Sequence, residues 1–463
     1  FLPQKNALKK AGGKDPCRNG HFALFMPQGT GKTKVVLDHS GSLWAEGKIT
    51  GAIVVAPKGV HRQWVEEGMP THYGAEYTAH FWPLKELPQD LLPDEHLKWL
   101  AINIDAIRTP KGKAILTEFV VEHKGRVLMI IDESYMIKNH RSQRWMAANE
   151  IGRKCLFRLI MTGTPIAKDL VDEWAQLKWL DESILGIRYV RSFRNEYCIM
   201  GGWDGKVIVG HKNMERFKAK VEPHSFRCTR EEAGILPKTY DHWRFDLAPR
   251  QRQMMTKMKQ TLIAQMDSGE ISTAANAAVA VMRLQQISNG FILDDDGNIQ
   301  MLFDDPLKNP RIIALQECLD SIDGKVVIWA RFHVDILSIL ALLGEKCVTY
   351  YGPNSPKHRE ESKRSFINTE VPYFVATPGT GGVGLDGLQT VCRRAVYYSN
   401  SENSIDRWQS EDRISRVNEI GAATLTDLVA IGSTDPKILR NLAGKKTLSD
   451  MALGEIRDWL EAD

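Results

Sequence analysis

The chain has 463 residues, which is too long for a single hydrophobic core and predicts two or three domains. A hydrophobic content of 43% and a charged content of 25% are typical of an ordinary globular protein, and no apolar run approaches the roughly 20 residues that cross a bilayer. The net charge of +4 is too small to indicate nucleic-acid binding by itself, so a basic binding surface would have to be local.

The seven cysteines are scattered and form no C-x-x-C pair. This usage favours a reducing compartment and argues against a structural zinc site. Residues 1–5 show no charged-then-apolar signal pattern. We therefore expect a cytoplasmic protein with no membrane partner.

Residues 26–33, Met-Pro-Gln-Gly-Thr-Gly-Lys-Thr, follow the apolar run 22–25 and predict a strand, a tight loop and a helix start. Such a loop directs backbone N–H groups and the positive end of a helix dipole at an anion. In this interpretation Lys32 reaches the β- and γ-phosphates of a nucleotide, and the Thr33 hydroxyl holds Mg²⁺. Met26 stands where the full phosphate-loop pattern has glycine, so a plain turn stays open for this segment alone.

The β-rich run 51–56 is typical of a strand buried on both faces of a parallel sheet. Loops after such strands form the ligand-binding edge of open α/β sheets. Lys58 and Arg62 lie in this position and could contact phosphates. A solvent-exposed helix start explains either residue equally well.

Residues 127–132 predict another buried strand, and it ends in the acidic pair Asp132 and Glu133. Beside a phosphate loop, the first carboxylate of such a pair can hold Mg²⁺ and the second can polarise the attacking water. Without that loop, the pair would only cap a strand. Thr162 and Thr164 follow a third strand, and their hydroxyls could hydrogen-bond to the acidic loop, although a plain turn explains them as well.

Residues 166–236 predict a helical, basic and aromatic insertion, and residues 249–300 predict a second helical insertion. From residue 325 onward, strands and helices alternate, which predicts βαβ units and a parallel sheet. We therefore expect two α/β domains, 1–236 and 237–463, of which the first carries the phosphate loop.

Residues 406–416 predict a helix in the second domain. Positions i, i+3, i+4 and i+7 share one face of it, and they are Gln409, Asp412, Arg413 and Arg416. Because arginine can grip a phosphate with two N–H groups, Arg413 and Arg416 could act on a γ-phosphate as an arginine finger, worth ~10³–10⁵ in rate. A charged, solvated helix face is the alternative.

In family order, these segments resemble the motifs of superfamily-two helicases, and specifically of the Swi/Snf-type DNA translocases. The matching segments span nearly the whole chain, and they are 27–33, 56–64, 132–139, 161–165, 283–289, 381–386 and 409–416. The resemblance implies two tandem RecA-like parallel-sheet lobes with helical insertions, and ATP with Mg²⁺ as cofactors. A motor this small resembles bacterial or viral members, which implies a nucleoid-associated protein or one in an infected host cell, and a nuclear protein only if the source is eukaryotic.

The resemblance also implies residue roles. Lys32 would bind phosphate, Glu133 would activate water, and Mg²⁺ would be held by Thr33 and Asp132. The residues implied in nucleotide binding are Gln4, Gly29, Thr30, Gly31, Lys32, Thr33, Gly384 and Asp386, and those implied in DNA contact or coupling are Lys58, Arg62, Thr162 and Thr164. Several positions depart from the family pattern. Tyr135 and Ser415 stand where histidine is usual, residues 417–419 stand where the last motif usually ends in Gly-Gln, and the threonine that usually precedes the glycines of the fifth motif is replaced around Pro378.

Taken together, these features predict an Mg²⁺-dependent ATPase that moves along double-stranded DNA, with branched DNA as a further substrate. ATP would bind between the two lobes, within reach of Arg413 and Arg416. Two alternatives stay open: a strand-separating or strand-annealing repair helicase, and an ATP-gated DNA clamp with little turnover. Protein partners are not indicated by the sequence.

Overall fold

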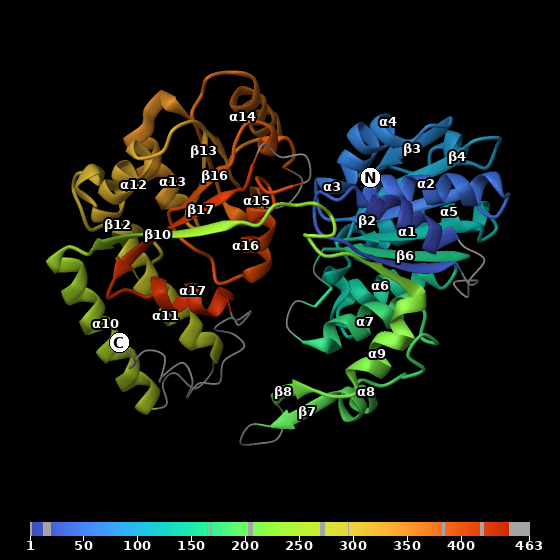
Figure 1. Ribbon diagram of the computed structural model, residues 1–463, viewed down its shortest axis with the longest axis horizontal. Helices are drawn as coiled ribbons and strands as arrows, with labels where there is room; N and C mark the ends of the chain where they lie inside the picture. The colour runs from blue at the N-terminus through green and yellow to red at the C-terminus, as the bar shows by residue number, and fades with distance from the viewer. Residues whose placement is uncertain are drawn as a thin grey trace. The chain divides into compact units, whose positions relative to one another are not determined.

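A computed structural model gives the structure of the chain (Figure 1). It divides into two compact units, Phe1–Gly234 (unit 1) and Ile235–Asp463 (unit 2), so the division lies two residues before the predicted boundary. The residues that the structure describes are 2–12, 20–163, 165–166, 169–201, 207–268, 274–294, 296–381, 385–416 and 421–443. Within this part of the chain, none of the helices combines the length and the apolar character needed to span a membrane.

Unit 1 is built on a seven-stranded sheet with the order β3-β4-β2-β5-β6-β1-β9, in which every pair of neighbours runs parallel. Its strands are β1 (His21–Phe25), β2 (Gly51–Ala56), β3 (Tyr77–Phe81), β4 (Leu97–Asn103), β5 (Val127–Asp132), β6 (Phe157–Thr162) and β9 (Ser225–Arg227). Every residue of β2 and β5 is buried, as expected for central strands covered on both faces.

Helices cover both faces of this sheet (Figure 1). One face packs against α1 (Leu2–Gly12), α2 (Lys32–Ala45), α3 (Val60–Gln63), the π-helical turn η1 (Trp64–Gly68) and α4 (Met69–His72). The other face packs against α5 (Pro110–Glu122), α6 (Gln143–Gly152), α7 (Leu170–Leu180), α8 (Val190–Tyr197) and α9 (Met214–Val221). Alternate residues of the strands point into the two layers: Ile53 and Met129 lie in the second, Val54 and Leu128 in the first.

The predicted helical insertion at 166–236 is in fact mixed. It holds α7, α8 and α9, but also an antiparallel hairpin of β7 (Cys198–Gly201) and β8 (Val207–His211). Its strand β9 returns to the main sheet and pairs with β1. Strands of three to five residues are too short to show a clear period of two, which is why the segment is predicted to be mainly helical.

Unit 2 is built on a six-stranded parallel sheet with the order β10-β17-β16-β13-β15-β14. Its strands are β10 (Thr239–Asp246), β13 (Val326–Trp329), β14 (Cys347–Tyr350), β15 (Tyr373–Ala376), β16 (Arg394–Tyr397) and β17 (Thr424–Ile431). The predicted α/β class, with a parallel sheet in each half of the chain, is confirmed.

The helices of unit 2 are α10 (Pro249–Asp267), α11 (Ala274–Asn289), α12 (Pro310–Asp320), α13 (His333–Leu343), α14 (Pro356–Asn368), α15 (Pro378–Gly381), α16 (Ser404–Glu411) and α17 (Asp435–Ala443). The predicted insertion at 249–300 contains α10 and α11. Helix α11 is followed by a short hairpin of β11 (Phe291–Leu293) and β12 (Ile299–Met301), whose three-residue strands are too short to give a periodic signal in the sequence.

A buried ion pair ties α12 to the start of α17. The guanidinium of Arg311 contacts Asp435 Oδ2 at 2.5 Å, and both side chains are almost fully buried. Arg311 also donates to the backbone carbonyls of Tyr398 and Leu428 and to the Ser288 hydroxyl. The arginine therefore joins α12 and α17 to the end of β16, the middle of β17 and α11.

We expect the substitution Asp435→Ala to lower the free energy of unfolding of unit 2 by roughly 3–5 kcal/mol, because it leaves the Arg311 charge buried without its carboxylate. Urea unfolding followed by circular dichroism measures this loss. The control is Asp246→Ala, which removes an exposed pair with Arg252 and should cost less than about 1 kcal/mol. Equal losses in the two variants would contradict the assignment.

Candidate functional site

The loop between β1 and α2 is shaped to hold an anion. Gly29 and Gly31 adopt left-handed backbone angles, with φ of 75° and 80°. Residues that carry a Cβ atom rarely adopt this conformation. The Thr30 hydroxyl donates to the Pro27 carbonyl at 2.7 Å and closes the turn. Because α2 begins at Lys32, its free N–H groups lie at the end of this loop.

Lys32 is held inside the loop. Its Nζ donates to the Met26 carbonyl at 3.0 Å and to the Pro27 carbonyl at 3.1 Å, and the side chain is buried. These contacts keep the ammonium at the loop, where a phosphate would bind. Thr33 is the next residue of the first turn of α2.

Gln4 reaches the same loop from α1. Its Nε2 donates to the Thr30 carbonyl at 3.2 Å, and a Cβ added to Gly31 would lie 1.8 Å from that nitrogen. The backbone angle therefore favours glycine at position 31, and any larger residue would also displace the Gln4 side chain. The structure places Gln4 beside the loop, and contact of this side chain with a nucleotide stays a prediction.

The two carboxylates of the acidic pair point to different partners. Glu133 has a left-handed backbone with φ of 52°, which is uncommon for a residue other than glycine. Asp132 Oδ2 accepts the indole N–H of Trp64 at 2.9 Å, and Oδ1 accepts the Glu133 backbone N–H at 2.9 Å. Two hydrogen bonds hold the Glu133 carboxylate itself: its Oε1 accepts from Gln28 Nε2 at 3.2 Å, and its Oε2 accepts from the Thr162 hydroxyl at 3.1 Å.

The Asp132 side chain suits a divalent cation. Burial, and next the charge of Glu133, raise the pKa of Asp132 to about 7, although the Trp64 N–H and the Lys32 ammonium act in the opposite direction. A bound cation would compensate this poorly stabilised negative charge. The Thr33 hydroxyl and the Asp132 carboxylate are the hard oxygen ligands that Mg²⁺ prefers. Among the described residues, no group of three or more His, Cys, Asp or Glu side chains gathers that could hold a metal ion.

The predicted hydrogen bond between Thr162 and the acidic loop is confirmed, because the hydroxyl of this fully buried residue donates to Glu133. Thr162 is the last residue of β6. Thr164 lies outside the described residues. Behind the acidic pair, the Ser134 hydroxyl donates to Gln176 Oε1 at 2.6 Å, and Gln176 Nε2 donates to the Pro165 carbonyl at 2.6 Å. Helix α7 thus fixes both the acidic loop and the turn after β6.

Lys58 and Arg62 follow the carboxyl end of β2, and both side chains are exposed. Since the sheet is parallel, this is the edge at which the phosphate loop and the acidic pair also lie. Arg62 Nε pairs with Glu66 Oε2 at 2.6 Å, and its guanidinium lies over the Phe81 ring at 5.6 Å from the centroid. Contact of Lys58 or Arg62 with DNA stays a prediction.

In unit 2 the prediction of one helix through 406–416 is wrong, because α16 ends at Glu411. The backbone N–H groups of Arg413 and Ile414 bond to carbonyls three residues back, which tightens the chain into a turn. Ile414 is fully buried in the core beneath the sheet, and this burial draws the chain away from the helix axis. Arg413 and Arg416 therefore lie beyond the helix.

Both arginines contact one carboxylate. Arg413 Nη1 lies 3.0 Å from Asp386 Oδ1 and donates to the Leu385 carbonyl at 3.1 Å, and Arg416 Nη2 lies 2.6 Å from Asp386 Oδ1. Partial desolvation acts to raise the pKa of Asp386, but the charges of Arg416 and Arg413 outweigh it and lower the pKa to about 2. The structure thus brings together three predicted site residues, while Gly384 lies outside the described residues.

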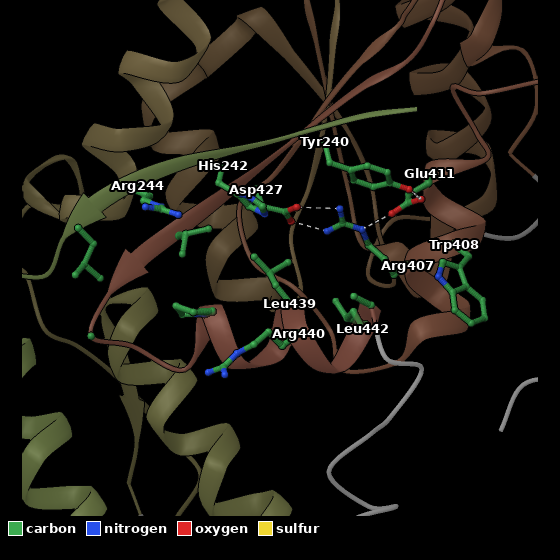
Figure 2. Close-up of a pocket in the computed structure, with 15 residues that line it drawn as sticks. Tyr240, His242, Arg244, Arg407, Trp408, Glu411, Asp427, Leu439, Arg440 and Leu442 are labelled. Atoms are coloured by element: carbon green, nitrogen blue, oxygen red, sulfur yellow. Dashed lines mark hydrogen bonds and ion pairs between the residues drawn. The ribbon is translucent and has the colours of Figure 1, made fainter. Parts of the chain in front are cut away.

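The end of α16 is anchored by a second charged cluster, which Figure 2 shows beside a cavity of about 730 Å³. Arg407 donates to both Asp427 oxygens, at 2.5 and 3.0 Å, and to Glu411 Oε1 at 2.7 Å. From β10 and the residue before it, the Tyr240 hydroxyl donates to Glu411 Oε2 at 3.0 Å, and Lys238 Nζ contacts Glu411 and Asp412. These contacts fix the turn that carries Arg413 and Arg416.

Several residues of the site were missed by sequence reasoning. Gln28 and Trp64 stand inside the quoted motifs, but their partners are 105 and 68 residues away along the chain. Arg407 and Lys238 bond to residues on other elements of unit 2. No spacing rule within a motif signals such contacts, so only the fold could reveal them.

The SNF2-related domain family matches residues 23–291, more than half of the chain. The probable ATP-dependent DNA helicase CHR12 of Arabidopsis thaliana is 25% identical over 92% of this chain, and the RAD54-like DNA repair and recombination protein of Danio rerio is 23% identical over 73%. The putative ATP-dependent helicase/translocase YwqA of Bacillus subtilis is 20% identical over 89%. The chain spans 39%, 50% and 44% of the lengths of these relatives, in the same order.

Among solved structures, the SWI2/SNF2 ATPase core of Sulfolobus solfataricus in complex with double-stranded DNA aligns with a TM-score of 0.42 and 20% identity. The alignment covers 100% of this chain and 94% of that chain. The family match and the two parallel sheets of the present structure together confirm the expected pair of RecA-like lobes.

We expect the substitution Asp386→Asn to destabilise unit 2 at pH 6, with a deficit that narrows as the pH falls from about 4 toward 2. The folded pKa of Asp386 is below its ordinary value, so its ionised form stabilises the fold above pH 4 and this contribution is lost on acidification. Urea unfolding between pH 2 and pH 6 measures the difference. The control Asp38→Asn, which breaks a surface pair with Lys34, should cost little at any pH. A deficit independent of pH would contradict the prediction.

Proposed function

Because the chain belongs to the SNF2-related domain family, we propose that it is a DNA-dependent ATPase that uses Mg-ATP to translocate along double-stranded DNA. The observation that carries the proposal is the carboxyl edge of the sheet in unit 1. There an anion-binding loop with its buried Lys32 lies beside two carboxylates that are held apart. Relatives named as ATP-dependent DNA helicases and as a DNA repair and recombination protein support the same activity.

In this mechanism the backbone N–H groups of the loop and the Lys32 ammonium bind the phosphates of ATP. Thr33 and Asp132 would hold Mg²⁺, and the chemistry that the ion supplies is neutralisation of charge on the phosphates. Glu133 orients the attacking water and accepts its proton. Gln28 and Thr162 hold the Glu133 carboxylate in place for this role by hydrogen bonds to its two oxygens.

Arg413 and Arg416 are proposed to stabilise the charge that develops on the transferred phosphoryl group. Both guanidinium groups contact Asp386, so they are already gathered around one anion. A phosphate would replace or share this carboxylate as their partner. The same pairing also favours the second candidate, an ATP-gated DNA clamp with little turnover, in which the arginines stay with Asp386.

DNA is proposed to bind through its phosphate backbone, with Lys58 and Arg62 contributing from the edge that carries the ATP site. Backbone contacts give little sequence preference and a strong dependence on salt. Thr162 would couple the two events, because it bonds directly to the residue that activates water. Strand separation is the remaining alternative within the same enzyme class.

We predict that duplex DNA stimulates ATP hydrolysis by at least about tenfold, and that raising the salt from 50 to 200 mM removes most of this stimulation. Phosphate release is measured without nucleic acid and with single-stranded DNA, duplex DNA, branched DNA and RNA. Lys32→Ala should show no turnover with any of them. An absence of stimulation by every DNA would refute the proposed function and favour the clamp.

We predict that Glu133→Gln binds ATP with nearly normal affinity but hydrolyses it about 10²–10⁴-fold more slowly, because an amide cannot accept the proton of water. Nucleotide binding and single-turnover hydrolysis are measured on the same preparation. Glu150→Gln is the matched control, since it alters an exposed glutamate that pairs with Lys113 on the surface. Robust hydrolysis by Glu133→Gln would rule out the water-activating role of Glu133.

A further inference from the structure

The π-helical turn η1 contacts both residues proposed to hold Mg²⁺. At its first residue, the Trp64 indole N–H donates to Asp132 Oδ2 at 2.9 Å. At its last residue, a Cβ added to Gly68 would lie 3.3 Å from Thr33 Cγ2, so the backbone of the turn lies directly against Thr33. Turns of this type are rare and occur frequently at functional sites.

We propose that Trp64 is a positioning residue that orients the Asp132 carboxylate for cation binding. The turn η1 packs against both proposed metal ligands, Asp132 and Thr33. This inference rests on the proposed function, because it assigns a role in the same Mg-ATP site. It adds a residue that contacts neither the nucleotide nor the metal ion but fixes the side chain that does.

The geometry around Asp132 supports this role. Each carboxylate oxygen already accepts one N–H group, from the Trp64 indole and from the Glu133 backbone, both at 2.9 Å. Two donors on different oxygens prevent rotation of the carboxylate, so they decide which of its lone pairs stay available. Mg²⁺ demands near-octahedral geometry. Removal of a residue that hydrogen-bonds to a metal ligand typically lowers the affinity for the metal by 10–100-fold.

Core packing alone does not account for the contact between Trp64 and Asp132. Trp99 belongs to the same hydrophobic cluster as Trp64 and is fully buried. In the part of the chain that the structure describes, the Trp99 indole nitrogen finds no hydrogen-bond partner. A tryptophan in this cluster is therefore tolerated without a carboxylate partner, and the bond of Trp64 is a separate feature.

The position of Trp64 also joins the metal site to the proposed DNA contacts. Helix α3 runs without a break into η1, and Arg62 lies two residues before Trp64. The His61 ring lies within hydrogen-bond distance of the Trp82 carbonyl, at 3.0 Å, and this contact holds the start of the segment against the loop that follows β3. Arg62 and Trp64 therefore lie on one continuous helical segment, which connects a proposed DNA contact with the partner of Asp132.

The test compares Trp64→Phe with Trp99→Phe. Each variant removes one indole N–H group, and both residues belong to the same hydrophobic cluster. Binding of the fluorescent nucleotide mant-ATP is measured with Mg²⁺ and with EDTA, and thermal unfolding reports the packing cost of each change. Trp64→Phe should weaken binding about tenfold with Mg²⁺ and leave binding in EDTA unchanged. Trp99→Phe should leave the ratio of the two affinities at the wild-type value.

A normal Mg²⁺ dependence in Trp64→Phe would overturn the role of Trp64, and so would the same loss in both variants. In an Asp132→Ala background, Trp64→Phe should add no further loss, and an additive loss would also overturn it. Wild-type protein that binds mant-ATP without any Mg²⁺ dependence would instead refute the proposed metal site itself, so the two failures are distinguishable.

Discussion

The divergence of two adjacent carboxylates at the end of β5 is the constraint on which the rest of the site depends. Asp132 turns to Trp64, while the left-handed backbone of Glu133 directs its side chain to Gln28 and Thr162. A left-handed residue other than glycine costs about 1–3 kcal/mol, which the buried strands on either side can sustain. The separation allows Asp132 to bind a metal ion and Glu133 to activate a water molecule, as proposed.

Sheet topology brings these groups together. The order β5-β6-β1 places the acidic pair, Thr162 and the phosphate loop on three neighbouring strands, all of which end at the same edge. In unit 2, ion pairs position the arginines. Asp386 contacts both Arg413 and Arg416, and the ion pair of Arg407 with Asp427 holds the end of α16 in place. A parallel sheet thus positions the site in unit 1, whereas ion pairs hold the two arginines in unit 2.

The predictable parts were those with a local signal. Buried strands such as 51–56 and 127–132 are continuous apolar runs, and the loop at 26–33 has a distinctive spacing. The half-buried β3 and the three-residue β9 have no such signal. The helix at 406–416 was predicted too long, because periodicity could not show that Ile414 is drawn into the core. Contacts such as Trp64 with Asp132 depend on the tertiary fold alone.

The division of labour between the two carboxylates is tested most directly by electron paramagnetic resonance of Mn²⁺ bound to the ATP complex. The wild-type protein is compared with Asp132→Asn and Glu133→Gln. We predict that Asp132→Asn weakens Mn²⁺ binding by at least about tenfold, whereas Glu133→Gln leaves it near the wild-type value. Equal weakening in the two variants, or a greater loss in Glu133→Gln, would contradict the account.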